Sequence, residues 1–151
     1  MIEAHFISDL FLSSVRLSVP LIFAAYGGMM SERSGVANIA LESYLLFSAF
    51  AAAAATSLFA SLWMGVLFGL LAAGLIGLLF AVICVYGRGD QVVIGTAFNL
   101  LAVGSIPVLN KALFGITGST PALPMQLRFT DPLVFFGLSI LVVVFLEFLF
   151  R

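Results

Sequence analysis

The sequence predicts an all-α fold, a polytopic bundle of about five transmembrane helices at roughly 20 apolar residues per crossing. The mean hydropathy is +1.26, and 63% of the residues are hydrophobic while 9% are charged. Soluble domains carry about 25% charged residues. Residues 43–87 contain no charged side chain at all. Because this block is long enough for two crossings, it predicts two spans joined by a turn within residues 56–63.

The first span is expected to end near Met30 and to be broken near Pro20. Proline removes a backbone donor and clashes with the preceding helical turn. A polar stretch, residues 31–38, then separates this span from a second one at residues 39–59, which Glu42 interrupts.

The third span is predicted at residues 62–86. Its Gly65 and Gly69 are four residues apart, a spacing of small residues that lets another helix backbone approach closely. The polar residues 87–91 end this span and precede the next one.

The fourth span is predicted at residues 92–114, with a second break near Pro107. Residues 115–131, rich in Gly, Ser, Thr and Pro, predict a loop. The last span, residues 132–150, begins with a proline in its first turn, where the missing donor costs nothing.

The few cations predict an orientation of the bundle. Arg33, Arg88 and Arg151 fall in loops on one side, and Lys111 and Arg128 fall on the other. Because positive charge is enriched on the cytoplasmic side, the three arginines are expected to face the cytoplasm.

Composition also argues against several functions. The net charge of −1 offers no basic face for nucleic acid. Cys84 and His5 are the single cysteine and the single histidine, so the sequence predicts no disulfide, no metal site and no cofactor. The chain also lacks a G-x-S-x-G elbow and a Walker A pattern, so we expect that it is not an enzyme.

Polar residues inside apolar segments are the candidate functional residues. Asn38 and Glu42 are four residues apart and are expected to share one helical face. An ionisable group in the hydrocarbon costs about 2.5 to 3.5 kcal/mol, so Glu42 is not expected to face lipid. The pair would either line a solute path or bridge neighbouring helices.

The fourth span carries the other candidates. Asn99 lies deep in it, where its amide would either bind a ligand or tie helices together. Phe98 beside it offers an aromatic face to a planar ligand. Asp90 precedes the span and is expected to cap it, and Gln91, which follows, is a second structural candidate.

Two strings carry a resemblance to a known family. Residues 26–46 read YGGMMSERSGVANIALESYLL, and residues 90–104 read DQVVIGTAFNLLAVG. They resemble the inner-membrane permeases of ABC importers, within the branch for nucleosides and simple sugars that is related to the ribose and branched-chain amino acid permeases. The resemblance implies a multi-pass protein of the inner or plasma membrane. It also implies three protein partners: an ATP-binding cassette ATPase that hydrolyses ATP, a second permease subunit and an extracytoplasmic solute-binding protein.

The resemblance further implies that residues 1–151 are a single transmembrane permease domain, the N-terminal half of a longer permease whose remainder docks on the ATPase. Where family members usually read Asn-Ile-Gly-Leu-Glu-Gly, residues 38–43 read NIALES. This departure puts close backbone approach at Ala40 and Ser43 in question.

The function expected from the resemblance is import of nucleosides or related small solutes. The residues expected to line the path are Asn38, Glu42, Phe98 and Asn99. Two other functions stay open: a membrane assembly or scaffold protein that does not transport, and an ion or proton channel built around Glu42.

Overall fold

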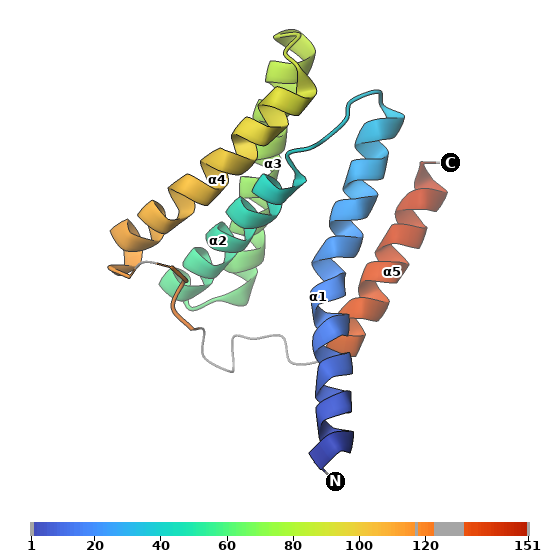
Figure 1. The fold of residues 1–151 in the computed structure, drawn as a ribbon, viewed down its shortest axis with the longest axis vertical. Coiled ribbons are helices and arrows are strands. Elements are labelled where there is room, and N and C mark those ends of the chain that lie inside the picture. The colour runs from blue at the N-terminus through green and yellow to red at the C-terminus, as the bar shows by residue number, and fades with distance from the viewer. Residues whose placement is uncertain (1, 117, 123–131, 151) are drawn as a thin grey trace. The chain divides into compact units, whose positions relative to one another are not determined.

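The computed structural model describes residues 2–116, 118–122 and 132–150. The regular structure of this described part is helical, without strands, as the sequence predicts (Figure 1). Five α-helices follow one another, and the third continues into a short π-helix, η1. Their bounds are α1 Ile2–Arg33, α2 Leu41–Phe59, α3 Leu62–Ala81, η1 Val82–Tyr86, α4 Gln91–Phe114 and α5 Pro132–Leu149. Of the described helices, α1, α2, α3 with η1, and α4 are long and apolar enough to cross a membrane.

The chain divides into two compact units. One unit comprises Met1–Met30 and Phe129–Arg151, and thus holds α5 and most of α1. The other, Ser31–Arg128, holds α2, α3, η1 and α4. The candidate residues named above lie in this second unit.

Both predicted helix breaks are wrong. Helix α1 continues through Pro20, and α4 continues through Pro107. A proline removes one hydrogen bond from the helical ladder, yet its fixed φ of about −65° is itself helical. The remaining bonds of helices as long as α1 and α4 are therefore sufficient to carry the helix past the proline.

Helices α2 and α3 form a tight hairpin. The turn between them is only Ala60 and Ser61, inside the predicted range, and Ala60 takes a left-handed conformation with φ of 48°. Such a short connection makes the two helices antiparallel neighbours, and Figure 1 shows them side by side.

The α2–α3 interface depends on two glycines. Gly65 and Gly69 are both buried, and each faces the side of α2 that carries Ser48, Ala52 and Thr56. A Cβ atom on Gly65 would collide with the Thr56 hydroxyl and would lie 2.9 Å from the Ala52 carbonyl oxygen. A Cβ atom on Gly69 would lie 3.1 Å from the Ala52 Cβ atom. The two backbones therefore approach as closely as the glycine spacing predicts.

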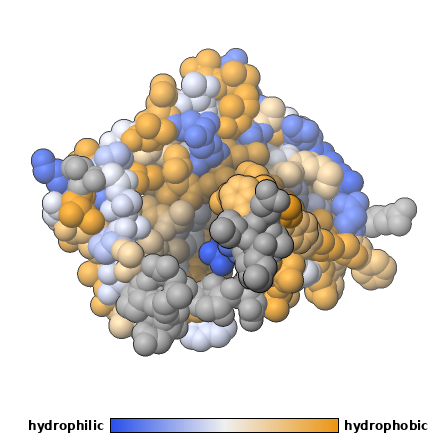
Figure 2. Space-filling model, turned by 60° about the horizontal axis from the view of Figure 1, so that its bottom comes forward, coloured by the Kyte–Doolittle hydropathy of each residue, from blue (hydrophilic) through white to orange (hydrophobic). Residues whose placement is uncertain are grey.

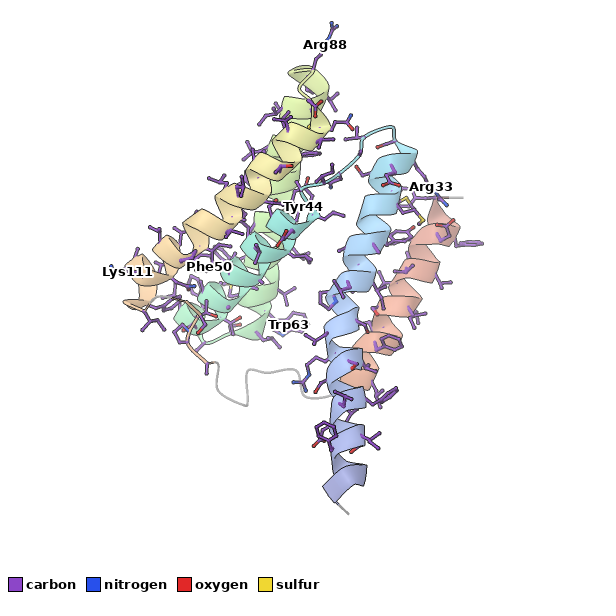
Figure 3. The ribbon with its side chains drawn as sticks, viewed as in Figure 1. Arg33, Tyr44, Phe50, Trp63, Arg88 and Lys111 are labelled. Atoms are coloured by element: carbon purple, nitrogen blue, oxygen red, sulfur yellow. The ribbon has the colours of Figure 1, made fainter. Side chains whose placement is uncertain are left out.

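The surface of α3 and η1 has the pattern of a membrane span. Trp63 and Tyr86, near the two ends, are 82% and 85% exposed. At 1.5 Å per residue they are about 35 Å apart along the helix, close to the ~30 Å thickness of the hydrocarbon. Tryptophan and tyrosine favour the membrane interface, and the exposed side chains between them include Leu70, Leu71 and Leu78. Figure 2 shows hydrophobic residues over large parts of the face in view, with hydrophilic residues between them. Figure 3 labels Trp63 near the start of α3.

Candidate functional site

One face of α4 contacts the segment that leads into α2. Gln91, Gly95 and Asn99 recur every four residues and so lie along this face. The Gln91 side-chain oxygen accepts a hydrogen bond of 2.7 Å from the Ala37 backbone nitrogen. A Cβ atom on Gly95 would lie 2.9 Å from the Ile39 Cβ atom, so the absence of a side chain at this position permits the contact. The amides and the glycine together join α4 to the start of α2.

Asn99 caps α2 from across the interface. Its Nδ2 donates to the Ile39 carbonyl oxygen at 3.0 Å, and its Oδ1 accepts from the Ser43 backbone nitrogen at 2.9 Å. Ser43 lies in the first turn of α2, where backbone N–H groups have no partner within the helix. Ala40, the N-cap residue, makes no side-chain capping bond. Asn99 thus supplies a cap that α2 lacks in its own sequence.

The backbone approach that the NIALES string put in question is present. Ala40 and Ser43 are both 0% exposed. A Cβ atom on Gly95 would come within 3.1 Å of the Ala40 backbone nitrogen. The close approach persists because the glycine lies on α4, opposite residue 40. The Ser43 hydroxyl is satisfied by donating to the Ala40 carbonyl oxygen at 2.6 Å.

Asp90 lies at the N-cap of α4. Its Oδ1 accepts from the Val92 and Val93 backbone nitrogens at 2.9 and 3.0 Å. This is the capping geometry expected from its place in the sequence. The preceding Arg88 is exposed, has a φ of 50°, and points away from the helices at the α3–α4 connection in Figure 3.

Aromatic side chains of α2, α3 and α4 contact one another. Phe80 is 3% exposed and makes edge-to-face contacts with Tyr44 and Phe98, with ring centroids 6.3 and 6.1 Å apart. Ala40 and Cys84 complete this cluster. Edge-to-face geometry is a favoured packing of aromatic rings, so the structure gives Phe98 a packing partner on α3.

One expected relation among the predicted path residues, the shared helical face of Asn38 and Glu42, is absent. Asn38 precedes α2, which begins at Leu41, so Asn38 and Glu42 do not share a helical face as the sequence predicts. The Asn38 side-chain oxygen instead accepts from the Ala40 backbone nitrogen at 3.1 Å. Glu42 is exposed in the first turn of α2, where an acidic group suits the positive end of the helix dipole.

Sequence reasoning passed over one polar residue of α4. Asn110 is 2% exposed, and its Oδ1 has no hydrogen-bond partner among the described residues. The residue also borders an open surface depression of about 230 Å³ that α2, α4 and residues 118–120 form. A signal was available, because Asn110 follows Asn99 by eleven residues, about three turns, and so lies on nearly the same helical face.

Groups that bind metals do not gather in the part of the chain that the structure describes. No three His, Cys, Asp or Glu side chains there are placed to hold a metal ion. Cys84, the single cysteine, is buried in η1. The groups that this site presents are side-chain amides, hydroxyls and aromatic rings.

Comparison with known proteins adds three findings. A family model described as "Branched-chain amino acid transport system / permease component" matches residues 10–151. The guanosine ABC transporter permease protein NupQ of Bacillus subtilis (strain 168) is 36% identical over 104 residues, which cover 65% of this chain and 33% of NupQ. The nucleoside ABC transporter permease protein NupC of Lactococcus lactis subsp. cremoris (strain MG1363) is 40% identical over 91 residues, covering 56% and 29%. The match thus spans about a third of each relative. No solved structure matches the chain significantly.

Proposed function

Because the chain belongs to the family of branched-chain amino acid transport system permease components, we propose that it forms part of the solute path of an ATP-driven importer. With four helices long and apolar enough to cross a membrane, it is a multi-pass membrane protein. The proposed cargo is a nucleoside or a related small solute. The observation that carries this proposal is the 36% and 40% identity to relatives named as guanosine and nucleoside permeases.

The arrangement of α2, α3 and α4 supports a role in a solute path. A permease needs polar groups held in fixed positions inside an apolar bundle, because unpaired polar groups in the hydrocarbon are costly. Helix α4 holds such amides at Gln91, Asn99 and Asn110, and Gly95 brings it against α2. The tight α2–α3 hairpin provides a support against which these amides can be positioned.

We keep the four candidates from the sequence as proposed path residues: Asn38, Glu42, Phe98 and Asn99. The observed contacts suggest different contributions. Asn99 would shape the path by fixing the backbone at the start of α2. Phe98 would shape it by packing against the ring of Phe80. Glu42, which is exposed at the start of α2, would contact solute or a neighbouring helix directly.

The proposal includes the rest of the importer. ATP is hydrolysed by a separate ATP-binding cassette subunit, a second permease subunit completes the path, and an extracytoplasmic binding protein delivers the solute. Residues 1–151 would form a single transmembrane permease domain, the N-terminal half of a longer permease, in the inner or plasma membrane. In the proposed orientation Arg88 faces the cytoplasm, because that side carries three cations, Arg33, Arg88 and Arg151, against two on the other, Lys111 and Arg128.

The test is uptake of labelled nucleosides into right-side-out vesicles of the native membrane, with and without a deletion of the gene. The deletion is expected to abolish ATP-dependent uptake, and the restored gene to return it. Equal uptake with and without the gene would reject the transport role and leave the scaffold hypothesis. For the channel hypothesis, Glu42→Gln would change an ionic current across the vesicle membrane, whereas the importer hypothesis predicts no such current.

A further inference from the structure

Helix α2 begins well short of the level at which α3 and α4 are connected (Figure 1). The ring of Tyr44, in the first turn of α2, meets the ring of Phe80 edge to face, with centroids 6.3 Å apart. Phe80 precedes Tyr86, the exposed aromatic residue at the end of η1, by six residues. At about 1.5 Å per residue, the first turn of α2 therefore lies about 9 Å deeper in the membrane than Tyr86, whose residue type favours the interface.

The non-helical segment before α2 reaches a similar depth beside α4. The Ile39 carbonyl oxygen accepts a hydrogen bond of 3.0 Å from Asn99 Nδ2. Asn99 follows Gln91, the first residue of α4, by eight residues, which correspond to about 12 Å of helix. Residues 37–40 therefore run down beside α4, from the Gln91 side chain to Asn99, as non-helical backbone at membrane depth.

Part of this deep segment is exposed. Irregular backbone occurs at membrane depth only where protein buries it or where it lines a water-filled cavity, because lipid offers its polar groups no hydrogen bonds. Ala40 is buried, but the described residues leave Ile39 40% exposed, and Glu42 in the first turn of α2 is exposed as well. A carboxylate at this depth favours contact with water over contact with lipid. The irregular backbone and the acidic side chain thus indicate water at the same place.

We propose that residues 38–42 line a water-filled entrance of the solute path, open on the side of the membrane that carries Arg88. The segment descends from that side, since it starts level with the beginning of α4. Within the entrance, the Glu42 carboxylate accepts hydrogen bonds from hydroxyl groups of the solute. This assignment rests on the proposed import function, and it places the path on one surface of the chain.

The experiment measures the access of water to introduced cysteines in the importer of the native membrane. Ile39→Cys and Glu42→Cys are the test variants, and the native chain, whose Cys84 is buried, gives the background. Leu79→Cys is the matched control, because Leu79 lies at the same depth on α3 and is 44% exposed, close to the 40% of Ile39. A membrane-impermeant maleimide is added to vesicles of either orientation. Rates are compared on the side from which Arg88→Cys reacts, after the chain is isolated by an affinity tag.

Both test cysteines should react at least about tenfold faster than Leu79→Cys, because the thiolate that attacks the maleimide forms in water and scarcely forms in hydrocarbon. The maleimide-treated importer is then reconstituted in liposomes with its binding protein, and uptake of radioactive guanosine is measured. The maleimide on Ile39→Cys should abolish most of the uptake, since the added group occupies the entrance. The same treatment should leave the rate of the native importer unchanged.

The other outcomes separate this proposal from the proposed function. Test cysteines that react as slowly as Leu79→Cys would overturn the entrance, and a fast reaction of Leu79→Cys would overturn the depth on which it rests. Unchanged guanosine uptake by the treated Ile39→Cys importer would remove the segment from the path and leave import standing. A native importer that takes up no guanosine rejects the proposed cargo, and the reaction rates still decide whether the entrance contains water. If Glu42→Cys does not accumulate in the membrane, the rate of Ile39→Cys decides.

Discussion

Replacing Gly65 by alanine should force α2 and α3 apart. The added Cβ atom would meet the hydroxyl of Thr56 and lie 2.9 Å from the Ala52 carbonyl oxygen. A side-chain hydroxyl can turn away, but a backbone carbonyl in the middle of a helix cannot. The matched control is Gly74→Ala in the same helix, because a Cβ atom there has no described neighbour within 4 Å.

The two substitutions should change stability in opposite directions. Alanine is favoured over glycine in a helix interior by about 1 kcal/mol, and Gly74→Ala should gain that amount. An extra methyl group in a well-packed interface costs typically about 1 to 3 kcal/mol. Since the contact at Gly65 includes backbone, we take the upper end, so Gly65→Ala should lose about 2 kcal/mol after the helix gain. Adding Thr56→Ala should recover only part of this loss, because the Ala52 carbonyl oxygen remains.

The single cysteine provides the assay. Cys84 is buried in η1, so a dye that fluoresces on reaction with thiols reports its exposure as the chain unfolds in detergent micelles on heating. At about 2 to 4 °C per kcal/mol for a chain of this size, Gly65→Ala should lower the melting temperature by about 4 to 8 °C. Gly74→Ala should raise it by about 2 to 4 °C. Equal shifts for the two variants would refute the idea that Gly65 is required by helix contact.

Three further predictions concern the cap of α4 and the contact between α4 and α2. Asn99→Leu leaves two backbone groups unpaired and should cost about 2 to 3 kcal/mol, seen as faster amide exchange at Ser43; unchanged exchange there would refute the cap. Asp90→Ala should cost about 1 kcal/mol in the same melting assay, and Asp90→Asn much less; equal losses would show that charge, not capping, is responsible. Gly95→Ala should lower the melting temperature, whereas Gly104→Ala, with no described neighbour within 4 Å, should not.

Most of the helical layout could be predicted from the sequence. Four spans are marked by apolar length alone, and the Gly65 and Gly69 spacing predicts a close helix contact. These features depend on residues near one another in the chain, which is why hydropathy and spacing reveal them. The predicted breaks at Pro20 and Pro107 failed because the local rule for proline does not weigh one lost bond against the rest of a long helix.

The amides of α4 show where sequence reasoning stops. Asn99 and Asn110 are the same residue type, eleven positions apart on nearly one helical face. Their difference comes from the atoms opposite each: Asn99 bonds backbone groups 56 and 60 residues away in the chain, whereas Asn110 Oδ1 is buried without a partner among the described residues. Such partners depend on how α4 packs against α2, which no pattern of neighbouring residues encodes. An amide whose oxygen and nitrogen are both used by the backbone of another helix positions that helix. In this chain Asn99 therefore positions the start of α2.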